Sequence, residues 1–365
     1  MKIYDSIIIG GGIAGVSIAF ELQNREKKVL IIDKDGIARG GSGSAGAFIS
    51  PKIGLASPLH TLTNQAFDYA KDFYTKHTKE YFFPSGVIRL AKDEVDSFKF
   101  KEYEKINYYE YKNLSSYELQ KYNIKPNLNA FLFPTAGDCD AVEVCESLSK
   151  GIDISIVDIK EIKREDDMWI VDKYKAKNLI LATGYESNLI DIRYMGIRGL
   201  WGERGDYISS KEIKYSIHQS LSIGASRDNI TKIGATHNRE IKEITTPNIQ
   251  KLKELEIKAY ELFDTNLKLK KAYGGMRAVS KDSYPLVGKV VDVEFMLTNH
   301  PNIKKGNLAQ LKYIDNLFVL NGMGGRGFVF APLMAKKLSQ LIIDKKEIEK
   351  IISPDRLFFK WVRRL

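Results

Sequence analysis

The chain has 365 residues, of which 44% are hydrophobic and 28% charged, and its formal net charge is +10. These proportions are typical of a soluble globular protein, and no apolar run reaches the ~18 residues of a membrane-spanning helix, which argues against an integral membrane protein. The length predicts two lobes, and the positive charge has two open explanations, a polyanionic partner or a solvated lysine-rich surface.

The N-terminal segment has the pattern of a strand, a glycine turn, a helix and a second strand. Residues 4–9 form a short apolar run that predicts a buried strand, and Gly10–Gly15 follow it directly as G-x-G-x-x-G. A helical pattern covers residues 16–24, and a second strand over 28–32 ends on Asp33. This order is typical of a dinucleotide-binding unit, whereas a lone glycine motif is also found in unrelated α/β proteins.

Each residue type in this segment has a physical role. Gly10 permits the tight turn, Gly12 lets the backbone approach a pyrophosphate, and Gly15 allows close packing of helix on strand. The helix N-terminus faces the anion. Asp33 is spaced to accept hydrogen bonds from a ribose. The segment therefore predicts a dinucleotide site.

The middle of the chain predicts entry into a second lobe. Glycines and serines in residues 36–51 suit a loop whose backbone N–H groups reach a ligand, and an amphipathic helix is expected over 59–75. Residues 82–91 predict a strand pair. Six tyrosines between residues 103 and 122 alternate with lysines, which suits either stacking on RNA bases or packing under a charged helix.

The remaining elements alternate between the lobes. The patterns predict helices over 141–150, 248–263 and 333–343, strands over 131–136, 152–157, 169–171, 178–184 and 316–320, a β-rich region over 196–246, and a loop system over 274–288. The nucleotide-binding sheet is thus visited near the start, middle and end of the chain.

Two further glycine-rich sites favour a flavin over a nicotinamide. Ala182-Thr183-Gly184 ends the predicted strand over 178–184, and the run from Gly322 to Pro332 opens the last helix. A helix N-terminus there would stabilise the negative charge of a reduced flavin.

With these motifs the chain resembles the D-amino-acid oxidase and glycine oxidase-like superfamily of FAD enzymes over nearly its full length. Within it, the chain most resembles the FAD-dependent oxidoreductase domain of the MnmC family, which makes 5-methylaminomethyl-uridine in tRNA. The finer resemblance rests on segments 40–51, 86–91, 233–236, 276–288, 322–333 and 354–357. Two places depart from the family pattern, Ser44-Ala45-Gly46 and Arg204-Gly205-Asp206.

The resemblance implies an α/β fold: a Rossmann-type FAD-binding domain with an inserted α+β substrate domain dominated by an antiparallel sheet. We expect the FAD-binding domain to be discontinuous over residues 1–80, 135–200 and 275–365, and the substrate domain to cover 81–134 and 201–274.

The resemblance and the motifs together give the candidate site. Arg277 is expected to bind the substrate carboxylate, since a guanidinium matches a planar carboxylate, although a structural ion pair with Asp282 or a nearby acid is the alternative. Arg326 is the second catalytic candidate, with an ordinary surface arginine as its alternative. The candidate FAD-binding residues are Gly10, Gly12, Ile13, Ala14, Gly15, Asp33, Lys34, Gly41, Ser42, Ile159, Ala182, Thr183, Gly184, Gly322, Gly324, Gly325 and Gly327.

The implied activity is oxidation of a C–N bond with FAD. The resemblance implies removal of the carboxymethyl group from 5-carboxymethylaminomethyl-uridine at the tRNA wobble position, giving 5-aminomethyl-uridine and glyoxylate. The alternative is a small-molecule oxidase or dehydrogenase for glycine, sarcosine or D-amino acids. tRNA is then the expected substrate, oxygen the expected electron acceptor, and a methyltransferase a separate partner, because the FAD motif begins at residue 10.

Cysteine and histidine usage sets further expectations. Cys139 and Cys145 form no C-x-x-C motif, and five scattered histidines complete no ligand set, so we expect no metal. Sparse cysteine suits a reducing compartment, and we expect the protein to be cytoplasmic.

Overall fold

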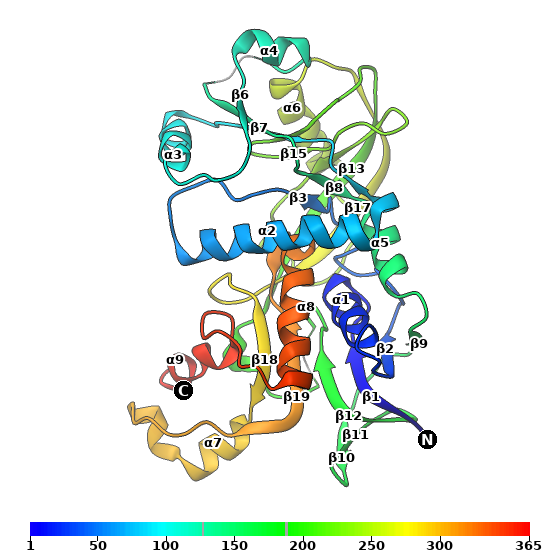
Figure 1. Cartoon of the computed structure of the whole chain (residues 1–365), viewed down its shortest axis with the longest axis vertical. Coiled ribbons are helices and arrows are strands. Elements are labelled where there is room, and N and C mark those ends of the chain that lie inside the picture. The colour runs from blue at the N-terminus through cyan, green and yellow to red at the C-terminus, as the bar shows by residue number, and fades with distance from the viewer. Residues whose placement is uncertain (126–127, 187–188) are drawn as a thin grey trace. The chain divides into compact units, whose positions relative to one another are not determined.

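The computed structural model describes residues 1–125, 128–186 and 189–365 (Figure 1). The chain divides into two compact units. The first comprises Met1–Gly43, Cys145–Leu200 and Met276–Leu365, and the second comprises Ser44–Val144 and Trp201–Gly275. In this division residues 44–80 and 135–144 group with the second unit, whereas the sequence patterns placed them in the FAD-binding domain.

The first unit is built on a parallel sheet. Its parallel strands, in spatial order, are β9 (Asp153–Ile156), β2 (Val29–Asp33), β1 (Lys2–Ile9), β12 (Tyr174–Leu181) and β19 (Tyr313–Asn321). Residues 7–9 of β1, 29–32 of β2 and 179–181 of β12 are apolar and buried, as expected for strands covered on both faces. The sheet is thus assembled from three distant parts of the chain, as the sequence patterns predicted.

Antiparallel strands and helices complete the first unit. The antiparallel strands are β10 (Lys163–Glu165), β11 (Met168–Val171) and β18 (Leu286–Val291). Figure 1 shows α1 (Ile13–Gln23) and α8 (Gly327–Asp344) side by side, and both helices bury apolar residues. The C-terminal part adds α7 (Val293–Asn299) and α9 (Phe358–Val362).

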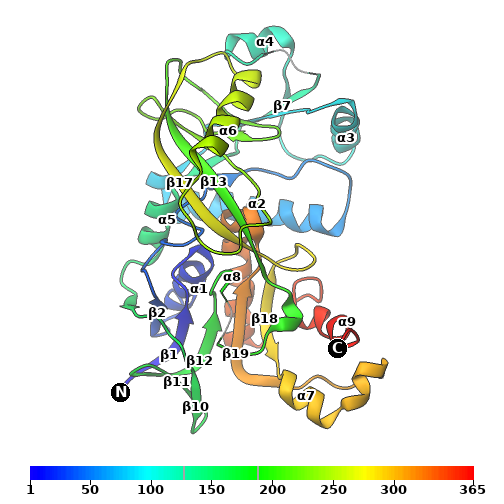
Figure 2. The same cartoon turned by 180° about the vertical axis from the view of Figure 1, so that it is seen from behind.

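The second unit is built on a mostly antiparallel sheet. Its strands, in spatial order, are β17 (Leu267–Val279), β13 (Arg198–Ser209), β16 (Ile230–Gly234), β15 (Ser222–Ile223), β14 (Ser216–His218), β5 (Val87–Leu90), β7 (Ala130–Phe133) and β6 (Lys112–Asn113). Figure 2 shows β13 and β17 running side by side. Only β14 and β5 pair in parallel among the strand pairs described in this sheet.

Helices and a small sheet surround this antiparallel sheet. The helices are α2 (Pro58–His77), α3 (Glu94–Glu104), α4 (Ser116–Lys121), α5 (Ala141–Leu148) and α6 (Ile249–Leu262), and the small sheet pairs β3 (Phe48–Ile49), β8 (Gly137–Cys139) and β4 (Phe82–Phe83). One face of the large sheet forms an apolar core that includes Ile88, Ile217 and Ile233, with Leu252 and Leu255 of α6.

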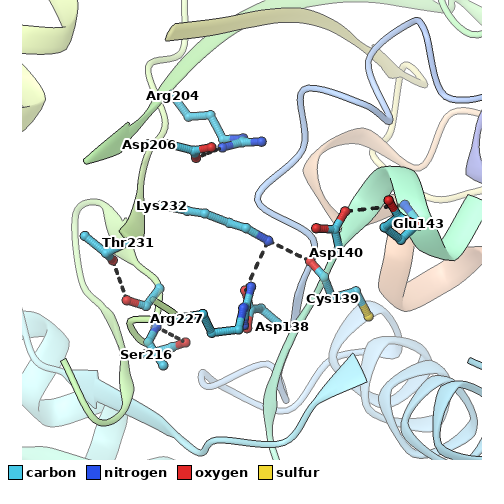
Figure 3. A network of polar contacts seen from close by, with 12 residues as sticks. Asp138, Cys139, Asp140, Glu143, Arg204, Asp206, Ser216, Arg227, Thr231 and Lys232 are labelled. Carbon is cyan, nitrogen blue, oxygen red and sulfur yellow. Dashed lines mark hydrogen bonds and ion pairs between the residues drawn. The ribbon is translucent and has the colours of Figure 1, made fainter. Parts of the chain in front are cut away.

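A buried ion cluster ties β8 to the large sheet. Asp138 is fully buried, and its two oxygens accept hydrogen bonds from Arg227 at 2.8 and 3.0 Å. Lys232 donates to Cys139 O at 2.8 Å and to Asp138 at 3.3 Å, so two cations converge on one carboxylate (Figure 3). This arrangement satisfies a charge that would otherwise be costly to bury.

The structure confirms the predicted fold class and corrects two predicted elements. The predicted loop system over 274–288 is wrong, because residues up to Val279 extend β17 and residues from Leu286 form β18. The last helix begins at Gly327 rather than at 333, with Pro332 inside it. None of the helices in the described ranges is long and apolar enough to cross a membrane.

Candidate flavin-binding and substrate site

The predicted glycine turn lies where the parallel strands end. Gly10 follows β1 with φ +114°, a conformation that favours glycine, and a Cβ there would lie 2.2 Å from Ala182 O at the end of β12. At Gly15 a Cβ would lie 1.8 Å from Gly10 O. These two contacts hold the turn against α1 and the neighbouring strand, which explains why both positions are glycine.

The N-terminus of α1 is open to an anion. Gly12 is its N-cap, and a Cβ at Gly12 would lie 2.9 Å from Ser42 Oγ. Ser42 Oγ accepts a hydrogen bond from the Ile13 N–H at 2.9 Å, and the first turn carries no acidic residue. Ser42 was expected to contact phosphate or flavin; the structure places it at the first N–H group of α1. The helix dipole favours negative charge at this end.

Asp33 organises the glycine turn from the end of β2. One carboxylate oxygen accepts from the Gly11 N–H at 2.7 Å, and the other accepts from the Asp35 and Gly36 N–H groups at 2.9 and 3.0 Å. The carboxylate is therefore fixed beside the turn. Lys34 lies next to it and pairs with Glu186 at 2.8 Å, which raises the pKa of Lys34.

The ends of β12 and β19 are linked beside this turn. Asn321 donates to Gly184 O at 2.8 Å, so the Ala182–Gly184 segment and the loop after β19 are held together. Gly322 and Gly324 have φ values of +75° and +58°. A Cβ at Gly327, the first residue of α8, would lie 3.3 Å from Ile13 Cγ2 at the first residue of α1. Two helix N-termini thus begin at the same edge of the sheet.

Arg277 lies against the same loop. It is half-buried near the end of β17, and a Cβ at Gly325 would lie 3.8 Å from its Cδ and Nε. Burial lowers the pKa of Arg277, but a guanidinium stays charged at neutral pH. Gly41 approaches Met276 O so closely that a Cβ at Gly41 would lie 2.5 Å from it. Within the first unit, Arg277, Gly41 and Gly325 are therefore neighbours.

The alternative role of Arg277, an ion pair with Asp282, is countered by the position of Arg356. Arg356 makes two hydrogen bonds to the Asp282 carboxylate, at 2.8 and 2.9 Å. Burial raises the pKa of Asp282, but the bonds from Arg356 outweigh it, so the net pKa lies below the ordinary value. The Arg356 guanidinium thus occupies both oxygens of the carboxylate that the alternative requires.

Arg326 and Ile159 are two further residues that the sequence analysis assigned to the site. Arg326 is half-buried and stands at the N-cap of α8. Ile159 follows β9 and is a partly buried residue packed on the core of the first unit. Their roles toward substrate and adenine stay predictions.

A polar group in the second unit was missed by the sequence analysis. Arg204 forms an ion pair with Asp206, its Nε donates to Ser44 O at 2.9 Å, and its guanidinium lies 3.9 Å from the ring centroid of Tyr273. Burial and the nearby Asp206 raise the pKa of Tyr273. The pairing depends on side chains two residues apart on one strand, which face the same side of the sheet. Arg204 and Asp206 stand two positions apart in the R-G-D sequence, and this spacing indicates such a pair. The sequence analysis treated R-G-D only as a departure from a family pattern.

The tyrosines between residues 103 and 122 include both buried and exposed side chains. Tyr103 is fully buried and Tyr111 packs on Phe131, whereas Tyr108 and Tyr117 are exposed. Lys121 lies 4.3 Å from the ring centroid of Tyr117. Among the described residues, no group of three His, Cys, Asp or Glu side chains is placed to hold a metal ion.

The first unit has the features that a dinucleotide phosphate requires: two helix N-termini whose N-cap residues make no side-chain cap bond, and glycines whose Cβ atoms would fill the approach. These features define a dinucleotide-binding α/β protein. The family model of the FAD-dependent oxidoreductases (DAO) matches residues 5–341, and the chain belongs to this family. FAD is therefore its cofactor.

Curated relatives that share one name match nearly the whole chain. "tRNA 5-methylaminomethyl-2-thiouridine biosynthesis bifunctional protein MnmC" of Legionella pneumophila (strain Lens) is 25% identical over 97% of this chain, and the protein of that name from Idiomarina loihiensis is 25% identical over 92%. The chain spans about 57% and 55% of the length of these relatives.

Solved structures show the same fold. Glycine oxidase from Bacillus cereus ATCC 14579 has a TM-score of 0.78 at 20% identity and covers 94% of this chain and 96% of its own. L-Proline dehydrogenase from P. horikoshii has a TM-score of 0.80 at 19% identity and covers 98% of both chains.

Proposed function

We propose that this chain oxidises a carboxymethylamine, and that the amine is carried by 5-carboxymethylaminomethyl-uridine at the tRNA wobble position. The observation that supports the amine chemistry most directly is the place of Arg277 against Gly325, in the loop that opens α8. A fixed guanidinium beside a flavin-binding loop suits a substrate that ends in a carboxylate. The tRNA part is supported by the similarity to MnmC proteins and by the net charge of +10.

In this proposal the protein's residues bind and orient. Arg277 holds the carboxylate, and the N-termini of α1 and α8 favour negative charge at the end of the parallel sheet. FAD, when bound, supplies the chemistry of accepting a hydride from the carbon next to nitrogen. The resulting substrate imine adds water and breaks its C–N bond, which gives glyoxylate and 5-aminomethyl-uridine. Oxygen is the proposed acceptor that regenerates the cofactor.

A small-molecule oxidase for glycine, sarcosine or D-amino acids is the competing function, because the same Arg277 geometry serves a free amino acid. The fold likeness to glycine oxidase favours this alternative. The two functions differ in the remote contacts that position the amine. A tRNA substrate would be gripped through its phosphates by lysines and arginines, which number 56 against 46 acids.

The test is flavin reduction without oxygen. The FAD-loaded protein is mixed with tRNA carrying the carboxymethylaminomethyl group, with the same tRNA lacking it, and with glycine, sarcosine and D-alanine, each at two salt concentrations. We expect fast reduction by modified tRNA alone, which slows at high salt because counterions are released on binding. Fast reduction by a free amino acid, with none by modified tRNA, would establish the small-molecule function instead.

A further inference from the structure

The second unit contains an arginine whose charge the described chain does not balance. Arg89 is on β5, in the middle of the antiparallel sheet, and its Nε–H is enclosed and donates to no atom of the described residues. Its neighbours Ile88 and Leu90 belong to the apolar core on one face, so Arg89 points to the other face. Burial lowers the pKa of Arg89, yet a guanidinium keeps its proton in proteins.

The nearest acid does not neutralise Arg89. Asp96 of α3 acts on it electrostatically, but the Asp96 carboxylate accepts from the Lys92 N–H at 3.2 Å and pairs with Lys99 at 3.6 Å. Within the described ranges, the enclosed Nε of Arg89 has no hydrogen-bond partner. A desolvated charge without a partner is costly, so a countercharge from outside the chain would stabilise the folded state.

A second unsatisfied group lies on the same face. The Tyr103 side chain of α3 is fully buried, and its hydroxyl has no hydrogen-bond partner in the described chain. Its ring centroid lies 6.5 Å from that of Phe131, and Phe131 is the residue paired with Arg89 across β5 and β7. Two enclosed and unsatisfied donors from different elements therefore lie near the same aromatic residue, Phe131.

We propose that Arg89 and Tyr103 form an oxyanion-binding site in the second unit, separate from Arg277, which takes a carboxylate or phosphate group of a ligand. The planar guanidinium donates two parallel hydrogen bonds to two oxygens of such a group, and the Tyr103 hydroxyl donates a further one. His60, whose ring lies 5.7 Å from that of Tyr103, adds no negative charge to the site. Arg89 as a whole residue is intermediate between buried and exposed, although its Nε is enclosed.

The experiment measures anion binding by the full chain with FAD bound, so that the cofactor's phosphates occupy their own site. Inorganic phosphate and acetate are titrated separately by calorimetry at constant ionic strength, and melting temperatures are recorded in parallel. The variants are Arg89→Met, Tyr103→Phe and Arg277→Ala, with Arg239→Gln as a control that removes an exposed arginine of the same unit.

We expect saturable binding of at least one anion and a rise in melting temperature of roughly 2–4 °C. Arg239→Gln keeps this response, Arg277→Ala keeps the part that depends on Arg89, Tyr103→Phe weakens that part, and Arg89→Met loses it, with an affinity lower by roughly tenfold or more. Arg89→Met is also expected to melt no lower than the wild type without anion, because it removes an unbalanced charge. Stronger binding of acetate assigns a carboxylate ligand, and stronger binding of phosphate assigns a phosphate.

Two results would overturn the site. One is the absence of any response of the wild type to either anion; the other is an equal response in Arg89→Met. The amine oxidation proposed above is tested separately by flavin reduction, and the second result leaves it untouched because Arg277 is intact in Arg89→Met.

Discussion

At the scale of single residues, Arg277 is the side chain with the most specific expected role. We predict that Arg277→Ala keeps its FAD but loses turnover, since removing a charge partner costs about 2–5 kcal/mol of carboxylate binding. Arg277→Lys should recover only part of the activity, because an ammonium lacks the planar fork. The flavin absorbance and the kinetic constants with the reactive substrate check both statements. Unchanged kinetics in Arg277→Ala would show that Arg277 has a structural role.

Gly12 tests the dinucleotide site directly. We predict that Gly12→Val abolishes FAD binding, because a side chain there would already crowd Ser42 Oγ at 2.9 Å and fill the approach to the α1 N-terminus. The measurement is the flavin content of the purified variant. Gly224→Ala is the control, since its Cβ meets nothing closer than 3.6 Å. A full flavin spectrum in Gly12→Val would remove the basis for the site.

The sequence predicted the glycine turn and Asp33 because their roles depend on local order along the chain. It could not predict Arg89 or the pairing of Arg204 with Tyr273, because these depend on which strands become neighbours. Arg89 and Tyr103 are 14 positions apart, and the fold places both of them near Phe131. Nothing in the local pattern around Arg89 indicates that its charge lacks a partner.

At the scale of elements, Asp282 and Arg356 fasten the C-terminal segment. The folded pKa of Asp282 lies below its ordinary value of 3.8, so its contribution to stability is complete above that value and is lost as pH falls through the folded pKa. We predict that Arg356→Gln lowers the melting temperature at pH 7 and that the difference from the wild type shrinks towards pH 3. Thermal melts at several pH values check this; a difference that stays constant would contradict it.

The buried ion cluster at β8 should contribute far more to stability than an exposed ion pair does. We predict that Asp138→Asn destabilises the protein by about 3–5 kcal/mol, because it leaves Arg227 and Lys232 without their shared carboxylate. Asp264→Asn is the control, since its pair with Lys211 is exposed and should be worth less than ~1 kcal/mol. Chemical denaturation of both variants gives the comparison. Similar values for the two would show that the cluster adds little.

The predicted elements that failed share a physical cause. Gly274, Gly275 and the following charged residues predicted a loop, but pairing with β13 keeps this segment extended as part of β17. Pro332 placed the start of the last helix too late, because the sequence does not show the burial of Phe328 to Ala331 that offsets the lost hydrogen bond. In both places tertiary contacts outweighed local propensity.

At the scale of the whole molecule, the cofactor should be bound without a covalent link and should stabilise the fold. The stretch from Gly322 to Pro332 contains no cysteine or histidine to attach the flavin ring. We predict that acid precipitation releases the yellow colour into the supernatant, and that adding FAD to the apoprotein raises its melting temperature. Colour that remains in the pellet would contradict the first statement, and an unchanged melting temperature the second.

The strand order of the parallel sheet has a consequence for synthesis of the chain. β1 is made first, whereas β19, which pairs with β12, ends only at Asn321. All segments of the second unit have been synthesised by residue 275, before that strand exists. Sheets joined across such long separations form slowly, because the intervening chain must be ordered first. We therefore expect a nascent chain on the ribosome to form the antiparallel sheet of the second unit before the parallel sheet of the first unit is complete. The chain should then bind FAD, and become yellow, only near the end of translation.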